Sequence, residues 1–147
     1  MIVVRSCLLA LTLTNIMMTR IYLLLTGLTY LGLAIWCTVA PETTSRKVGF
    51  SLNGDSGASE FMTVYGGLEF GLALILLLPF VRPEMESFSL LSCLLIHGSL
   101  VLFRGASLMI YRDFGGFTGR LAVCEWVILL AGLAVYGLSS RSAAPPS

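Results

Sequence analysis

Four runs of apolar residues alternate along the chain with short charged or glycine-containing stretches. The runs cover about 21–40, 61–80, 88–111 and 121–138. Apolar positions within each run are contiguous rather than confined to one helix face, which is the pattern of a membrane-spanning segment. At about 1.5 Å per residue, such a run covers the roughly 30 Å of the hydrocarbon core. The pattern therefore predicts four transmembrane helices.

The connections between the runs favour a single membrane domain. Most are short, so we expect an all-α fold, an integral membrane four-helix antiparallel bundle over residues 18–140. The longest is the 41–60 loop, where Phe50 is expected to dip into the headgroup region. Residues 141–147 are rich in Ser, Ala and Pro and are expected to form a disordered tail.

Residues 1–17 do not form a further span. The stretch from Ser6 to Thr19 is apolar but too short to cross a bilayer alone. It is interpreted either as an N-terminal extension of the first helix or as sequence upstream of a natural start at Met17 or Met18. A cleaved signal peptide is a third interpretation. A signal peptidase would have to cut the bond directly before Pro41, and proline is unsuitable at that position. A retained helix is therefore favoured.

Composition agrees with a membrane protein. Hydrophobic residues make up 56% of the chain and charged residues 12%, too few to cover the surface of a soluble fold. The net charge of +1 provides no basic surface for nucleic acid. We expect membrane lipid around the protein, and a homo-oligomer or an unidentified membrane protein as partner. Lys and Arg residues flanking the spans divide equally between the two sides, so the orientation stays open.

Motifs for catalysis or metal binding are missing from the sequence. The four cysteines lie within apolar runs and form no Cys-x-x-Cys pair: Cys7, Cys37, Cys93 and Cys124. No P-loop, dinucleotide fingerprint or His-Glu-x-x-His sequence occurs. The sequence therefore predicts no catalytic residue, no metal and no cofactor.

Three charged residues lie inside the predicted spans. A charge at bilayer depth costs at least ~2.5 kcal/mol, so each needs a partner. Measured from the side of the 41–60 loop, Glu69 and Arg104 lie roughly 12–14 Å deep, and Glu125 lies roughly 7–8 Å deep. We therefore predict a Glu69–Arg104 ion pair with Glu125 as a second acceptor. This acid–arginine–acid cluster would join the second, third and fourth helices.

Two polar residues could assist this cluster. Tyr65 precedes Glu69 by one turn on the same helix face, so its hydroxyl is expected to hydrogen-bond the carboxylate. His97 shares a face with Arg104, about two turns away. Its imidazole is interpreted either as a donor to a backbone carbonyl, which we favour, or as a proton carrier.

Glycines of the second span are expected to pack inside the bundle. Gly67 and Gly71 have the spacing that lets another helix backbone approach closely, and Gly66 lies beside them. A homodimer seam is the alternative interpretation, and internal neighbours make it the weaker one.

Three short sequence blocks carry a family resemblance. They are Ala40-Pro41-Glu42, Val48-Gly49-Phe50 and the run from Val64 to Glu69 (Val-Tyr-Gly-Gly-Leu-Glu). In these blocks the chain resembles a family of small bacterial four-helix membrane proteins, a domain of unknown function. The resemblance covers about residues 18–138. It implies four helices in a bacterial inner membrane and brings no activity with it.

The sequence leaves three hypotheses for function. The favoured one is a structural or accessory protein in which the buried polar cluster fixes the order of the helices. The second is an oligomeric transporter that conducts protons or a small solute along Glu69 and Arg104. The third is an enzyme acting on lipid or quinone, with Glu69, His97 or Glu125 as acid or base.

Overall fold

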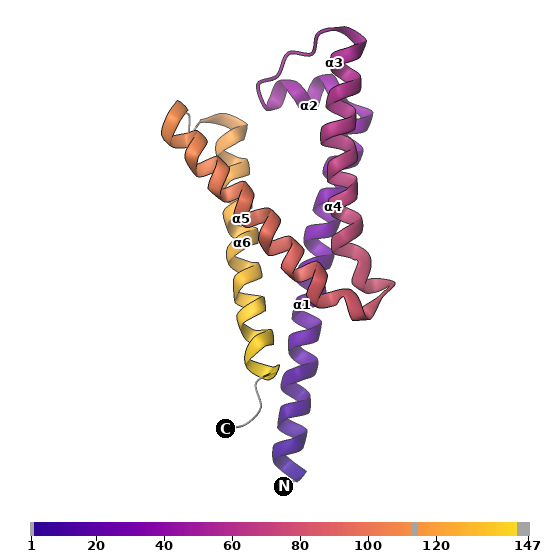
Figure 1. The fold of residues 1–147 in the computed structure, drawn as a ribbon, viewed down its shortest axis with the longest axis vertical. Helices are drawn as coiled ribbons and strands as arrows, with labels where there is room; N and C mark the ends of the chain where they lie inside the picture. Colours follow the sequence, from indigo (N-terminus) through magenta and orange to yellow (C-terminus); the bar gives the residue numbers. More distant parts are fainter. Residues whose placement is uncertain (1, 113–114, 144–147) are drawn as a thin grey trace.

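The computed structural model consists of helices joined by short connections, and it describes residues 2–112 and 115–143, with side chains for 13–112 and 115–139 (Figure 1). The long helices are α1 (Ile2–Val39), α5 (Glu86–Tyr111) and α6 (Gly116–Ala143). Another long rod is built from α3 (Gly54–Phe61), the π-helical segment η1 (Met62–Gly67) and α4 (Leu68–Leu77). Short segments complete the chain: α2 (Pro41–Lys47), η2 (Leu78–Phe80) and η3 (Pro83–Met85).

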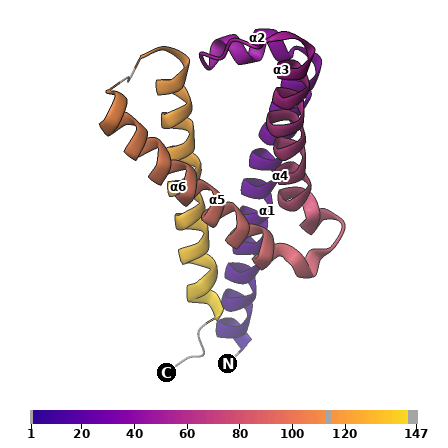
Figure 2. The ribbon, with the colours of Figure 1, turned by 45° about the horizontal axis from the view of Figure 1, so that its top comes forward.

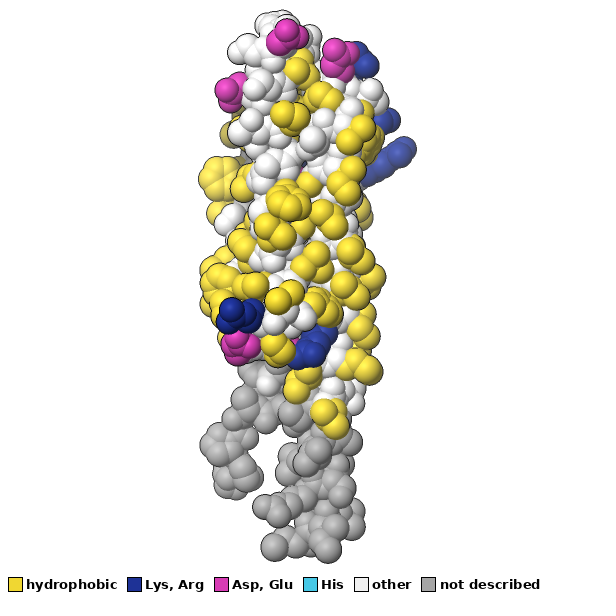
Figure 3. All heavy atoms as spheres, turned by 90° about the vertical axis from the view of Figure 1, so that its right-hand side faces the viewer, with side chains coloured by type: hydrophobic (Ala, Val, Ile, Leu, Met, Phe, Trp, Pro, Cys, Tyr) yellow, Lys and Arg dark blue, Asp and Glu magenta, His cyan; other side chains and the backbone are white. Residues whose placement is uncertain are grey.

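Four helices in the described part of the chain are long and apolar enough to cross a membrane. They are Leu13–Val39, Gly54–Phe80, Pro83–Tyr111 and Gly116–Ser139. The predicted spans are thus confirmed as helices of suitable length and composition, and each starts earlier than predicted. The reason is that helical hydrogen bonding continues through polar turns that an apolar pattern excludes. Figure 3 shows a mostly hydrophobic surface between two levels at which charged side chains gather.

The helices continue toward both ends of the chain. Helix α1 is continuous from Ile2, in agreement with the interpretation of residues 1–17 as an N-terminal extension of the first helix. Its 38 residues would extend about 57 Å, longer than the roughly 30 Å of a hydrocarbon core. Helix α6 runs to Ala143, so the first residues of the predicted tail, 141–143, are helical. Residues 144–147 lie outside the described part of the chain.

The 41–60 connection is more ordered than the predicted loop. Pro41 begins α2, where a proline at the first position loses no hydrogen bond. Gly49 and Gly54 turn the chain toward α3 with φ of 81° and 61°, values that glycine adopts without strain. Phe50, expected in the headgroups, packs against Phe61 and Tyr65 at ring-centroid distances of 6.4 Å and 5.8 Å, with 46% of its surface exposed.

The long helices pair into two hairpins. Helix α1 packs along η1 and α4 to form the first hairpin, and α5 packs on α6 to form the second. Helix α1 also contacts α6, which joins the hairpins. Figure 2 shows the hairpins converging near η2 and η3 and diverging toward α2. The buried core lies where they converge, and its members are Leu23, Tyr30, Ala73, Leu76 and Cys93.

Candidate functional site

The second hairpin is held by a bidentate ion pair. Arg104 on α5 donates from Nε to Glu125 Oε2 at 3.0 Å and from Nη2 to Glu125 Oε1 at 2.6 Å. The two side chains are 25% and 13% exposed. The planar guanidinium matches both carboxylate oxygens, which gives the strongest form of such a pair. Arg104 and Glu125 were both predicted as members of a buried cluster, and the structure joins them directly.

Glu69 lies apart from this pair, which differs from the predicted Glu69–Arg104 contact. Among the described residues no ion pair joins Glu69 to Arg104, and the buried Oε2 of Glu69 has no hydrogen-bond partner. The prediction compared depths along the helices, and equal depth does not make two helices neighbours. Here α4 packs on α1 whereas α5 packs on α6, so the arginine faces Glu125.

Tyr65 does not supply the missing donor to Glu69 Oε2. Its ring stacks on Phe61 with centroids 4.5 Å apart and lies 5.8 Å from Phe50. The residue belongs to η1, and a π-helical turn holds more residues than an α-helical turn. Because this turn separates Tyr65 from Glu69, the two side chains do not follow the α-helical spacing on which the prediction relied.

His97 is 1% exposed and is bound through both ring nitrogens. Nδ1 lies 2.8 Å from the carbonyl oxygen of Cys93, which can only accept, so Nδ1 carries a proton. Nε2 lies 3.1 Å from the hydroxyl of Tyr30, which donates to it when the imidazole is neutral. This arrangement agrees with the favoured interpretation of His97 as a donor to a backbone carbonyl.

Tyr22 and Tyr30 of α1 are site residues that the sequence reasoning missed. The hydroxyl of Tyr22 lies 3.1 Å from Cys93 Sγ and donates to the carbonyl oxygen of Ile128 at 2.9 Å. These contacts connect α1 with α5 and α6. A signal was present in the sequence for Tyr30, because it lies in the middle of an apolar span rather than at its ends, where tyrosines usually anchor.

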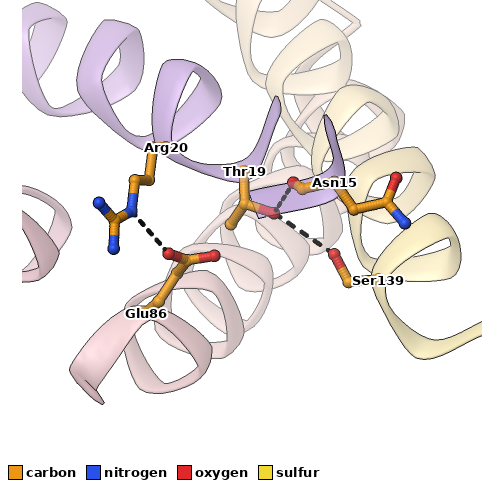
Figure 4. Close-up of polar contacts among 5 residues, drawn as sticks. All are labelled: Asn15, Thr19, Arg20, Glu86 and Ser139. Atoms are coloured by element: carbon orange, nitrogen blue, oxygen red, sulfur yellow. Dashed lines mark hydrogen bonds and ion pairs between the residues drawn. The ribbon is translucent and has the colours of Figure 1, made fainter. Parts of the chain in front are cut away.

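A second polar cluster joins α1, α5 and α6 where the hairpins converge (Figure 4). Arg20 Nε donates to Glu86 Oε2 at 2.9 Å, with side chains 39% and 19% exposed. Thr19 Oγ1 donates to the carbonyl oxygen of Asn15 at 3.0 Å and lies 3.3 Å from Ser139 Oγ. Arg20 and Glu86 lie just outside the predicted spans, so this interhelical cluster was not predicted.

The glycines of the second span divide between two environments. A Cβ on Gly66 would lie 2.5 Å from Thr38 Oγ1, so α1 and η1 approach closely there, as predicted. A Cβ on Gly67 or Gly71 would meet nothing within 4 Å, so these two do not pack inside the fold. Gly132 of α6, which was not singled out, permits close contact, because a Cβ there would lie 2.5 Å from the Tyr22 hydroxyl.

Surface grooves lie away from the residues of the predicted polar cluster. One groove of about 270 Å³ lies beside Arg20 and Phe80, and another of about 440 Å³ lies between α5 and α6 beside Trp126. Neither groove is lined by Glu69, His97, Arg104 or Glu125. Among the described side chains, no group of three or more His, Cys, Asp or Glu residues is arranged to hold a metal ion.

Comparison with known proteins gives no further assignment. No protein-family model, curated protein or solved structure matches the chain. The resemblance to a bacterial four-helix family therefore stays a prediction from the sequence blocks that carry it.

Proposed function

We propose that this chain is a multi-pass membrane protein of a structural or accessory kind, a four-helix antiparallel bundle whose helix pairing is fixed by polar contacts. The observation that supports the proposal is that two arginines of the long helices each bind a carboxylate on another helix. Arg104 binds Glu125, and Arg20 binds Glu86. The family resemblance adds a bacterial inner membrane as the location.

The polar contacts determine which helices become neighbours more than they stabilise the folded bundle. In membranes an interhelical hydrogen bond contributes only ~0.6 kcal/mol on average, because the separated helices also find partners. A wrongly paired helix would, however, leave a charge in hydrocarbon without its partner, at a cost of several kcal/mol. The Arg104–Glu125 pair thus selects α6 as the neighbour of α5. A stable framework of this kind suits a protein that acts by contacting lipid or another membrane protein.

A flux assay tests the proposal. The purified chain is reconstituted into liposomes carrying an internal pH dye, and proton flux is driven by a pH gradient with a potassium diffusion potential. A structural or accessory protein gives the flux of protein-free liposomes. Flux above that level in wild type, abolished by Glu69→Gln and retained in the exposed control Glu60→Gln, would contradict the proposal.

An oligomeric proton or small-solute transporter is the second candidate. The observation that favours it is Glu69, whose buried Oε2 lacks a partner within a candidate span. Four spans are few for a transporter acting alone, so this candidate also requires a stable oligomer. The same liposome assay separates the two candidates, because only the transporter predicts flux that depends on Glu69.

A further inference from the structure

A groove of about 270 Å³ runs along one face of α1 beside η2. Its α1 residues recur every three or four positions from Leu13 to Leu24, so they form one stripe on the helix. Phe80 of η2 also lines the groove. Among the described residues that line it, only Arg20 is charged and the others are apolar. The groove therefore combines an apolar surface with a single basic group.

Arg20 lies at one boundary of the proposed membrane domain. Val39, which ends α1, is about 28 Å farther along the helix, close to the roughly 30 Å thickness of a hydrocarbon core. Side chains on a helix lean toward its N-terminus, which directs the guanidinium of Arg20 toward the membrane surface. Figure 3 shows charged side chains gathered near the lower end of the hydrophobic surface. The phosphate groups of a bilayer lie directly outside its hydrocarbon core, at the level of this guanidinium.

The guanidinium of Arg20 has hydrogen-bond donors that the fold does not use. Its Nε donates to Glu86 Oε2 at 2.9 Å (Figure 4). A guanidinium carries five N–H donors, and the structure shows no other hydrogen bond from this one to a described residue. The side chain is 39% exposed, so its terminal nitrogens are accessible to a ligand. Phosphate oxygens match the planar fork of a guanidinium and accept strong, charge-assisted hydrogen bonds from it.

We propose that this groove binds a phospholipid of the surrounding bilayer. The phosphate oxygens accept hydrogen bonds from the terminal nitrogens of Arg20, and one acyl chain lies against Ile21, Leu24 and Phe80. Because Glu86 already compensates the charge of Arg20, the site recognises the phosphate group through hydrogen bonds rather than a net negative charge on the lipid. Lipid binding of this kind rests on the proposed function, because it requires a chain that lies in a membrane and names the partner that the chain contacts there.

A second copy of the chain fits this stripe less well than a phospholipid does. In a symmetric dimer with the two helices parallel, each residue of the stripe faces its own counterpart. Arg20 lies within the stripe, so two guanidinium groups would approach each other, and like charges repel strongly where little water is present. A phospholipid instead brings a hydrogen-bond acceptor to the same place and hydrocarbon to the apolar residues beside it.

Native mass spectrometry of the full chain in detergent tests the proposal. The protein is titrated with dioleoylphosphatidylcholine and, separately, with dioleoylglycerol, which has the same acyl chains and no phosphate. Wild type is expected to bind the phospholipid about tenfold more tightly, or by ~1.4 kcal/mol. Arg20→Gln should lose this preference and keep the affinity for dioleoylglycerol. Arg46→Gln removes an arginine that is also paired with a carboxylate but lines neither groove, and it should keep the wild-type preference.

A second pair of variants tests the apolar part of the groove and covers the case in which Arg20→Gln does not fold. Ile21→Trp fills the groove without changing the ion pair and should weaken the binding of both lipids about tenfold, or by ~1.4 kcal/mol. Ile35→Trp makes the same change at an exposed position of α1 outside the groove and should bind both lipids like wild type. Equal binding by these two variants contradicts the proposed position of the acyl chain.

Three further results would overturn the proposal. They are equal affinities of wild type for the two lipids, an unchanged preference in Arg20→Gln, and displacement of the bound phospholipid by inorganic phosphate, which would show that Arg20 binds phosphate without the groove. None of these results depends on proton flux, so each would leave the proposed function standing. Flux above the level of protein-free liposomes would contradict the proposed function without changing the preference for phospholipid.

Discussion

Each hairpin carries one carboxylate within the apolar runs of its sequence, and the two carboxylates have opposite surroundings. In the second hairpin, Glu125 accepts two hydrogen bonds from Arg104. In the first hairpin, Glu69 has a buried oxygen without a partner. A fully paired charge fixes which helices are neighbours, whereas an unpaired one contributes nothing to that choice. The contrast indicates that the ion pair fixes the helix pairing of the second hairpin, whereas Glu69 does not contribute to that of the first.

The largest expected loss of stability comes from breaking the ion pair of the second hairpin. Arg104→Gln leaves the carboxylate of Glu125 largely buried without its cation, which destabilises a protein by about 3–5 kcal/mol. The variant should unfold at a clearly lower temperature in detergent, as followed by circular dichroism. Arg120→Gln, an exposed arginine on α6, serves as the control and should unfold like wild type. Equal unfolding temperatures for Arg104→Gln and the control would contradict a structural role for the pair.

The second largest loss of stability is expected where η1 approaches α1 closely in the first hairpin. Gly66→Ala places a methyl group 2.5 Å from Thr38 Oγ1 and should destabilise by about 1–3 kcal/mol. Gly67→Ala is the matched control, because its Cβ meets open space, and alanine raises helix propensity by about 1 kcal/mol. Urea unfolding of both variants checks this difference. Equal stabilities would show that α1 and η1 are farther apart than the structure places them.

A smaller effect is expected where the hairpins converge. Tyr30→Phe removes the hydroxyl that lies 3.1 Å from His97 Nε2 and should destabilise by about 0.6–1.7 kcal/mol. Tyr111→Phe is the control, because Tyr111 is 76% exposed. The ring signals of His97 in an NMR spectrum should change in the first variant alone. If His97 responds equally to both substitutions, the contact between Tyr30 and His97 does not exist.

The smallest effect on stability is expected at the unpaired carboxylate. Glu69→Gln removes a group that has no basic partner, so stability should stay within about 1 kcal/mol of wild type or rise. Loss of stability comparable with that of Arg104→Gln would show that Glu69 has a structural partner. The measurement is the same thermal unfolding in detergent, so the stabilities of Glu69→Gln and Arg104→Gln can be compared directly.

The spans were predictable because apolar runs of membrane length leave few alternatives. The neighbours of each span were not predictable, and the assignment of Arg104 shows why. Glu69 lies at a depth similar to that of Arg104, and the sequence gives depth through helix rise. It does not give the angle at which helices cross. In the structure α5 lies along α6, which brings Glu125 to the arginine instead.

The other differences between the sequence predictions and the structure have local causes. The π-helical segment Met62–Gly67 changes the spacing between Tyr65 and Glu69, and a pattern of apolar residues contains no signal for it. Tyr30 and Tyr22 are uncharged, so the search for charges inside the spans did not include them, although Tyr30 contacts His97 and Tyr22 contacts Cys93. The contact of His97 with the Cys93 carbonyl agrees with the favoured interpretation of this residue, because a helical histidine readily reaches the preceding turn.

The most direct test of the account is a pair of double-mutant cycles measured by thermal unfolding in detergent. One cycle combines Arg104→Gln with Glu125→Gln, and the other combines Arg104→Gln with Glu69→Gln. The account predicts a coupling energy of about 1–3 kcal/mol between Arg104 and Glu125, and none between Arg104 and Glu69 beyond the ~0.5 kcal/mol expected for separate sites. Strong coupling between Arg104 and Glu69, with none to Glu125, would contradict the hairpin pairing on which the account rests.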